Sequence, residues 1–157
     1  MGVAIPFAVG AQFNRPGQLI IAIEGDGGFN MSSIELKTLM DQKLPIKLAI
    51  VNNNSEMMVE FWQKLFYEKR YIGTSNDNQD YGLLAQSFGI ESIACGNASE
   101  LKSKIQLWLS SPGASILNLI TEKTPCLPLV KPGCSIENMI TNDDDYLDLR
   151  SGSDEIG

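Results

Sequence analysis

Two short stretches of this sequence carry residue types that can hold a metal ion against a phosphate. Residues 24–33 read EGDGGFNMSS, and residues 52–54 are three consecutive asparagines. Asp26 offers a carboxylate oxygen and Asn53 a neutral carbonyl oxygen, and Mg²⁺ takes such oxygens together with those of phosphate and water. The chemistry that these stretches suggest is therefore metal-assisted binding of a phosphorylated ligand.

Three glycines flank the acidic residue of the first stretch. At Gly25, Gly27 and Gly28 the backbone can approach a phosphate closely, with its N–H groups pointing at the ligand. A helix expected to begin near Ser33 aims its positive end in the same direction. A bare structural turn would need one glycine and would gain nothing from Asp26, so the composition favours a binding loop.

Each stretch taken alone has an ordinary explanation, because glycine and asparagine fill many turns. The pair is more demanding, since each stretch directly follows an apolar strand pattern and precedes a helical one. Ligands of parallel α/β sheets bind beyond the carboxyl ends of the strands. The two stretches together therefore favour one shared site over two unrelated turns.

The elements that must position this site alternate along the chain. Apolar runs predict strands over residues 19–24, 46–51, 92–95 and 114–121. Apolar residues at helical spacing, with a capping-box match at 32–35, predict helices over residues 4–12, 33–42, 58–66, 79–88 and 101–109. This alternation predicts the α/β class: a three-layer α/β/α fold with a mostly parallel sheet covered on both faces.

Length and charge narrow the function classes. The chain has 157 residues, 43% of them apolar, which is enough for one hydrophobic core. Its net charge is −7, and the segment from Asp143 to the end, with six acidic residues and one arginine, carries most of it. We therefore expect no nucleic-acid partner, no membrane segment, and a solvated, disordered acidic tail over residues 141–157.

Histidine is absent from the sequence, which excludes Ser-His and Cys-His catalytic pairs and histidine-based zinc sites. The three cysteines, Cys95, Cys126 and Cys134, lack metal-ligand spacing. Their odd number argues against a disulfide framework and fits a reducing compartment.

Five segments of the chain carry a known pattern: MGVAIPFAVGAQ (1–12), EGDGGFNMSSIEL (24–36), LPIKLAIVNNN (44–54), MVEFWQKLFYEKRY (58–71) and PCLPLVKPG (125–133). With GDG followed by NN, they resemble the cofactor-binding domain of thiamine-diphosphate enzymes. More closely, they resemble the catalytic subunit of acetolactate synthase (acetohydroxyacid synthase). The resemblance covers residues 1–140, which we expect to form the cofactor-binding domain.

The resemblance implies thiamine diphosphate and Mg²⁺ as cofactors. It implies Asp26, Asn53 and the carbonyl of Ser55 as the Mg²⁺ ligands. The residues that it places around the diphosphate are Gly25, Gly27, Gly28 and Phe29. FAD, which occurs in the full-length family, has no site in this chain.

Further cofactor and substrate contacts are implied at apolar residues. Met1 falls where the family places a large apolar residue under the bent cofactor, and Met58 and Val59 fall beside the thiazolium ring. Trp62 matches a tryptophan that shapes the pocket for the second 2-ketoacid. Met58 and Trp62 lie on an apolar helical stripe, which is equally typical of residues packed in a core. Met1 could equally belong to a disordered N-terminus.

The implied reaction is decarboxylation of pyruvate and carboligation to a second 2-ketoacid, a step of branched-chain amino acid biosynthesis. The cofactor performs the hard chemistry and the protein supplies placement. The expected partners are the two ketoacids, further copies in a dimer or tetramer, upstream domains and a regulatory subunit. The expected compartment is the cytoplasm, or a plastid or mitochondrion for a longer precursor.

Two departures from the family pattern bear on activity. Glu56 and Met57 stand where the family has Gln-Gly, which adds a carboxylate near the diphosphate and removes the φ freedom of a glycine. No glutamate of the chain matches the one that activates the cofactor in the family, so no catalytic residue is assigned. We therefore expect the C-terminal piece of an enzyme, inactive without its upstream domains.

Two other functions stay open. One is a non-catalytic cofactor-binding or subunit-interaction module, and the other is a different thiamine-diphosphate carboligase or decarboxylase. The tract around Trp62 and the segment PCLPLV favour acetolactate synthase over the second. The resemblance implies that the sheet is incomplete relative to the family domain. An incomplete parallel sheet would expose apolar edge and face, so we expect the isolated chain to aggregate, to unfold in part or to bind a partner.

Overall fold

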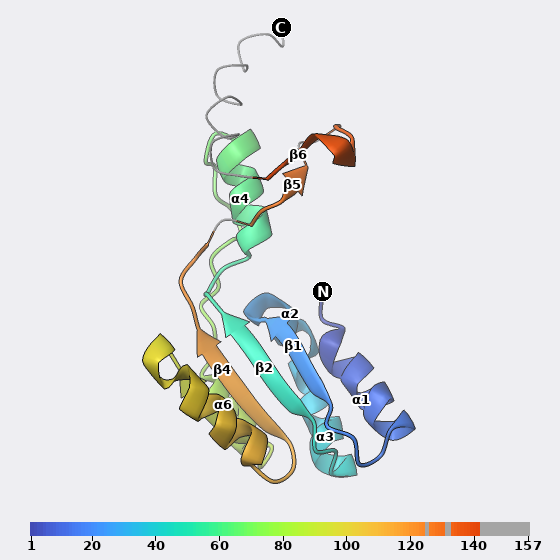
Figure 1. Ribbon diagram of the computed structural model, residues 1–157. Coiled ribbons are helices and arrows are strands. Elements are labelled where there is room, and N and C mark those ends of the chain that lie inside the picture. The colour runs from blue at the N-terminus through green and yellow to red at the C-terminus, as the bar shows by residue number, and fades with distance from the viewer. Residues whose placement is uncertain (125, 131–132, 142–157) are drawn as a thin grey trace, which may run out of the picture. The chain divides into compact units, whose positions relative to one another are not determined.

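The computed structural model describes residues 1–124, 126–130 and 133–141, and the chain falls into two compact units (Figure 1). Unit 1 comprises residues 1–55 and 75–123, and unit 2 comprises residues 56–74 with the described residues from 124 onward. The domain boundary expected near residue 140 stays a prediction. The expected acidic tail lies, from residue 142 on, outside the described residues.

Unit 1 is built on a four-stranded sheet in which every paired strand is parallel, in the order β1-β2-β4-β3. Its strands are β1 (Ile21–Gly25), β2 (Lys47–Asn52), β3 (Glu91–Cys95) and β4 (Ser115–Ile120). The central strands β2 and β4 read as apolar runs because they are buried between neighbours. This sheet, with helices against it, confirms the predicted α/β class.

Most helices of unit 1 pack on one face of the sheet (Figure 1). They are α1 (Ala4–Asn14), α2 (Asp26–Ser32), the short 3₁₀ helix η1 (Ser33–Glu35), α3 (Leu36–Gln42) and α5 (Tyr81–Ser87). Their inward side chains form one core with alternate residues of the strands, among them Phe29, Leu36, Leu48, Ile50 and Ile116. The first layer of helices and the sheet therefore share a single hydrophobic core.

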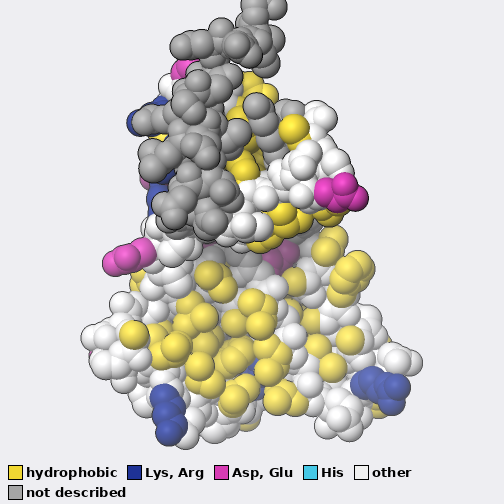
Figure 2. All heavy atoms as spheres, turned by 45° about the horizontal axis from the view of Figure 1, so that its top comes forward, with side chains coloured by type: hydrophobic (Ala, Val, Ile, Leu, Met, Phe, Trp, Pro, Cys, Tyr) yellow, Lys and Arg dark blue, Asp and Glu magenta, His cyan; other side chains and the backbone are white. Residues whose placement is uncertain are grey.

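The opposite face is covered over only half of its width. Helix α6 (Leu101–Ser110), preceded by the 3₁₀ helix η2 (Ala98–Glu100), packs Trp108 on β3 and β4, and the indole donates to the Ser115 carbonyl over 3.1 Å. Over the edge strand β1, Ile23 is 66% exposed and Ile21 45% exposed. Figure 2 shows hydrophobic side chains gathered on this unit. Helices therefore lie on both faces of the sheet, as predicted, and part of the second face stays open because one helix of about 10 Å diameter covers only about two strands.

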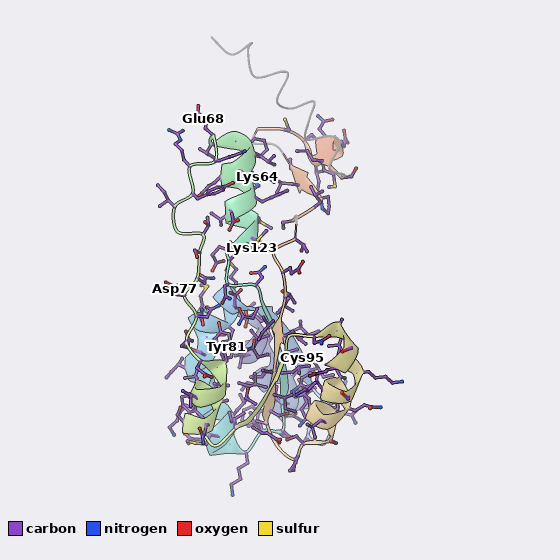
Figure 3. All side chains as sticks on the ribbon, turned by 90° about the vertical axis from the view of Figure 1, so that its left-hand side faces the viewer. Lys64, Glu68, Asp77, Tyr81, Cys95 and Lys123 are labelled. Carbon is purple, nitrogen blue, oxygen red and sulfur yellow. The ribbon has the colours of Figure 1, made fainter. Side chains whose placement is uncertain are left out.

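Unit 2 contains helix α4 (Met57–Phe66), a short antiparallel pair of strands, β5 (Leu129–Val130) and β6 (Met139–Ile140), and the 3₁₀ helix η3 (Ile136–Asn138). Phe61 of α4 is buried, and the ammonium group of Lys64 lies over its ring. Figure 3 labels Lys64 on this helix. None of the helices that the described residues form has the length and apolar content to span a membrane.

The helix expected to begin near Ser33 begins at Asp26 instead. The capping-box prediction is wrong, because the Ser32 hydroxyl donates to the Glu24 carboxylate and the Gly28 carbonyl rather than capping a backbone N–H. The helical segment instead continues from α2 through η1 into α3. The acidic and glycine residues therefore form a first helical turn and not a loop.

Candidate functional site

The ends of β1 and β2 bring the two predicted stretches together. These strands are parallel neighbours, and Gly25 pairs with Val51 at the end of their register. The residues that follow, Asp26 and Asn52, therefore leave the same edge of the sheet side by side. The prediction that the glycine-rich and asparagine-rich stretches share one edge is confirmed by this register.

Asp26 is the first residue of α2, and only 2% of its surface is exposed. Its Oδ2 accepts a hydrogen bond of 2.7 Å from the Asn78 side chain. In the part of the chain that the structure describes, no lysine or arginine forms an ion pair with this carboxylate. A carboxylate withdrawn from water without a cation is costly unless other groups compensate its charge.

Asn78, from the segment that leads into α5, stands at the meeting point of three oxygens. Its Nδ2 lies 2.7 Å from Asp26 Oδ2, 3.1 Å from Asn52 Oδ1 and 2.9 Å from Asn54 Oδ1. Its own Oδ1 accepts from the Asn30 amide over 2.8 Å. One carboxylate and two amide oxygens thus converge on a single nitrogen at the end of the sheet.

The asparagine turn after β2 explains this convergence. Asn54 has a φ of 55°, a left-handed conformation that asparagine tolerates, and its N–H donates to Asn52 Oδ1 over 3.2 Å. Asn53 Oδ1 instead accepts from the Ser55 N–H over 3.0 Å. The structure therefore turns the oxygens of Asn52 and Asn54, rather than that of Asn53, toward Asp26, and the roles of Asn53 and Ser55 as metal ligands stay predictions.

The three glycines next to Asp26 differ in their exposure and in the space around them. Gly25 is exposed and precedes α2, whereas Gly27 and Gly28 are buried in its first turns. A Cβ at Gly28 would stand 2.7 Å from Cγ of Glu24, so a larger residue there would force the Glu24 side chain to move. At least one of the three glycines therefore contributes to packing, apart from any role with a ligand.

Phe29 lies behind the site in the core. Its side chain is 1% exposed and its ring meets that of Tyr81 edge-on, with 5.0 Å between centroids. The Tyr81 hydroxyl donates to Asn30 Oδ1 over 3.0 Å. Figure 3 shows Tyr81 on α5, with Asp77 on the segment before it. Burial, and then the negative charge of Asp26, raises the pKa of Tyr81 to about 12, against the lowering effect of the Asn30 hydrogen bond.

The remaining predicted contacts lie elsewhere in the two units. Met1 is 74% exposed at the start of unit 1. In unit 2, Met58 is 60% exposed and Val59 45% exposed, while Trp62 is half-buried and packs edge-on against Phe66. A cavity of about 490 Å³ in unit 2 is lined by Val59, Trp62, Gln63, Tyr67, Arg70 and Ile72. Val59 and Trp62 therefore line a cavity, and their cofactor and substrate roles stay predictions.

The donor set at the end of the sheet fits a hard divalent cation. Its members are one carboxylate and two amide oxygens, the ligand types that Mg²⁺ takes alongside phosphate and water. Among the described residues, no three His, Cys, Asp or Glu side chains gather into a cluster, so amide oxygens supply what further carboxylates would. The residues present thus fit a magnesium ion bound together with a phosphorylated ligand.

Sequence reasoning missed three members of this group. Asn52 and Asn54 were visible as neighbours of Asn53, but the choice among three consecutive asparagines depends on the turn conformation. Asn78 had no motif and stood only in a polar stretch between two predicted helices. Its place beside Asp26 follows from the fold alone.

Comparison with known proteins agrees with this geometry. Residues 1–119 match the family described as thiamine pyrophosphate enzyme, C-terminal TPP binding domain. The chain is 38% identical over 131 residues to the mitochondrial acetolactate synthase catalytic subunit of Saccharomyces cerevisiae, covering 83% of this chain and 19% of the yeast protein.

Two further relatives give the same result. Identity to the acetolactate synthase large subunit of Pyropia yezoensis is 37% over 135 residues, covering 84% of this chain and 23% of that protein. Identity to the acetolactate synthase isozyme 2 large subunit of Escherichia coli is 37% over 134 residues, covering 84% and 24%. The chain thus spans about a fifth to a quarter of the length of these relatives. With its parallel sheet and strand-end oxygens, the chain belongs to the thiamine pyrophosphate enzymes, as the C-terminal TPP-binding domain of an acetolactate synthase-like protein.

Proposed function

We propose that this chain binds thiamine diphosphate through Mg²⁺ as part of an enzyme that decarboxylates pyruvate and joins the product to a second 2-ketoacid. The observation that carries the proposal is the buried Asp26 carboxylate, which shares the end of the sheet with the amide oxygens of Asn52 and Asn54. Oxygens of this kind hold Mg²⁺, and the ion in turn holds a diphosphate.

The residues of this chain have binding and positioning roles in the proposal. Asp26, with oxygens from the turn over residues 52–55, holds the ion, and the backbone at Gly25 and Gly27 borders the diphosphate. When bound, thiamine diphosphate supplies the carbanion chemistry of decarboxylation and carboligation. Trp62, which lines the cavity of unit 2, shapes the pocket for the second ketoacid.

The relatives are the basis for what we propose about further domains, assembly and compartment. They are acetolactate synthases several times longer than this chain. We propose that the activity requires further domains, that the protein works as an oligomer with or without a regulatory subunit, and that it acts in the cytoplasm or in an organelle, as the mitochondrial yeast relative does.

Titration calorimetry tests the proposal. Thiamine diphosphate is titrated into the purified chain with Mg²⁺ and then with EDTA, and the measurement is repeated for Asp26→Ala. We expect binding that requires Mg²⁺ and is lost in Asp26→Ala, because removal of the carboxylate removes the charged ligand of the ion.

Asp41→Ala is the matched control, since Asp41 is an exposed acidic residue paired with Lys37 on α3. It should bind as the unchanged chain does. No binding by a folded chain would overturn the proposal and favour a module that has lost its cofactor site. Equal binding by Asp26→Ala would overturn it as well, because the cofactor would then be held without the Asp26 carboxylate.

A further inference from the structure

We propose that Asn78 is a positioning residue, which holds the oxygens of Asp26, Asn52 and Asn54 together before a cation binds. The inference rests on the proposed function, because it concerns the same site. Its basis is the placement of one side-chain nitrogen within 3.1 Å of all three oxygens.

More acceptors surround the Asn78 nitrogen than it has hydrogens to donate. A carboxamide NH₂ carries two hydrogens, so it satisfies two acceptors at a time. Three acceptors surround it, and one of them is a carboxylate. The group therefore has more acceptor capacity than Asn78 can use, and a cation is the partner that such an excess fits.

Asn78 also offsets the mutual repulsion of these oxygens. Three oxygen atoms with partial or full negative charge repel one another at this separation. Asn78 places a partial positive charge between them, so they stay close when no ion is present. Ligands that are held in place beforehand lose less freedom when they bind the metal, and partners that orient such ligands typically contribute a factor of about 10 to 100 in metal affinity.

The segment that contains Asn78 is held in place by other residues. Asn76 N–H donates to the Asn54 carbonyl over 3.0 Å, and Ser75 pairs with Ser55 in a β-bridge. On the other side, the Asp80 side chain caps α5 by accepting from the Leu83 N–H. With the backbone held on both sides, the side chain of Asn78 is not needed to fix its own segment.

The test measures the Mg²⁺ dependence of thiamine diphosphate binding by calorimetry, and the unfolding temperature in EDTA and in Mg²⁺, for the unchanged chain and Asn78→Ala. We expect the dissociation constant for Mg²⁺ to rise about tenfold or more in Asn78→Ala, as for other residues that orient metal ligands. A purely structural role would lower the unfolding temperature in EDTA and leave the Mg²⁺ dissociation constant unchanged.

Gln79→Ala is the matched control. Gln79 follows Asn78 in the chain, and its side chain donates to Asn30 Oδ1 instead of to Asp26. Its Mg²⁺ dissociation constant should stay within about twofold of the unchanged chain, since a twofold change is under 0.5 kcal/mol. Equal weakening by both substitutions would overturn the inference.

Asn78→Asp provides a second variant of the same shape. It replaces the N–H donors with another acceptor, so the variant should unfold at a lower temperature in EDTA and gain more from Mg²⁺ than the unchanged chain does. An unchanged Mg²⁺ response in both Asn78 variants would overturn this inference and leave the proposed function standing. If the unchanged chain itself shows no Mg²⁺-dependent binding, the proposed function fails and the inference fails with it.

Discussion

Asp26 and its neighbours show how a buried charge is kept without an ion pair. The carboxylate is 2% exposed, yet its partner is the neutral amide of Asn78 and not a lysine or arginine of the described residues. A neutral donor compensates a carboxylate less completely than a cation does. At the scale of single residues, the site is therefore built to gain from an added positive charge.

Tyr81 gives a prediction about pH at the same scale. Its pKa is raised to about 12, first by burial and then by Asp26, whereas an unfolded tyrosine ionises near pH 10. The raised pKa means that the neutral Tyr81 hydroxyl contributes to the free energy of unfolding. This contribution is fully present below pH 10 and is lost as the pH rises through about 12. We expect the stability advantage of the unchanged chain over Tyr81→Phe to shrink by about 1 kcal/mol between pH 9 and pH 11.

Urea unfolding of both proteins at several pH values measures this difference. The comparison with Tyr81→Phe removes the contributions that the two proteins share. A difference that stays constant from pH 9 to pH 11 would show that Tyr81 ionises in the folded chain as it does in the unfolded one.

At the scale of elements, the junction of β1 and α2 depends on the absence of a side chain. The helix begins directly at Asp26, so its first turns lie against the end of the strand they follow. A Cβ at Gly28 would stand 2.7 Å from Cγ and 2.8 Å from Oε1 of Glu24. Glu24 also accepts a hydrogen bond from Ser32, so moving the Glu24 side chain away would break that bond.

Two matched substitutions test this junction. Gly28→Ala should lower the free energy of unfolding by about 1 kcal/mol, because the added methyl overpacks against Glu24 by more than helix propensity returns. Gly10→Ala, in α1 with no atom within 4 Å of its Cβ position, should raise it by about 0.5 to 1 kcal/mol. Urea unfolding measures both changes.

The double variant identifies the cause. Glu24→Ala in the Gly28→Ala background should recover most of the loss, because the two positions are in contact and their effects are not additive. If Gly28→Ala and Gly10→Ala stabilise the chain alike, the close approach of helix and strand is not a constraint.

The start of α4 answers a question raised by the family pattern. Met57, which stands where the family has glycine, is the first residue of that helix, and it is not among the described residues with a left-handed φ. The backbone there therefore needs no glycine. Glu56 precedes the helix, and its N–H donates to the Thr74 carbonyl over 2.9 Å.

At the scale of the whole molecule, unit 1 leaves part of its sheet open. Ile21, Ile23 and Val51 lie on the face that α6 covers in part, and they are 45%, 66% and 39% exposed. Contiguous apolar surface of this kind on a sheet promotes association, and β1 is also an edge strand. The expected exposure of apolar sheet surface is present at this face.

We expect the isolated chain to self-associate at micromolar concentration through this face. Ile23→Lys should weaken the association at least about tenfold, because it places a charge where apolar surface would be buried. Ile34→Lys is the control, since Ile34 is 70% exposed on η1, outside this face. Sedimentation velocity measures both. A monomer with a sharp unfolding transition at high temperature would contradict the expectation.

Local patterns in the sequence predicted most of the fold. Apolar runs and helical spacing located four strands and five helices within a few residues, because those patterns record which side of each element is buried. The start of α2 was misplaced, since glycines and an acid resemble a loop. Exposed apolar sheet surface was expected, but its place over β1 could not be predicted, because strand order and the number of covering helices are not local properties.

For the site, the sequence by itself determined that Asp26 and three asparagines each follow an apolar strand pattern, and that the chain resembles the thiamine-diphosphate enzymes. Only the tertiary structure decided that Asn52, Asn54 and Asn78 surround that carboxylate while Asn53 turns to Ser55. The contacts of Asn78 join positions 24 to 52 residues apart. Such contacts exist only once the sheet and α5 have packed, because no local pattern records where a distant side chain will stand.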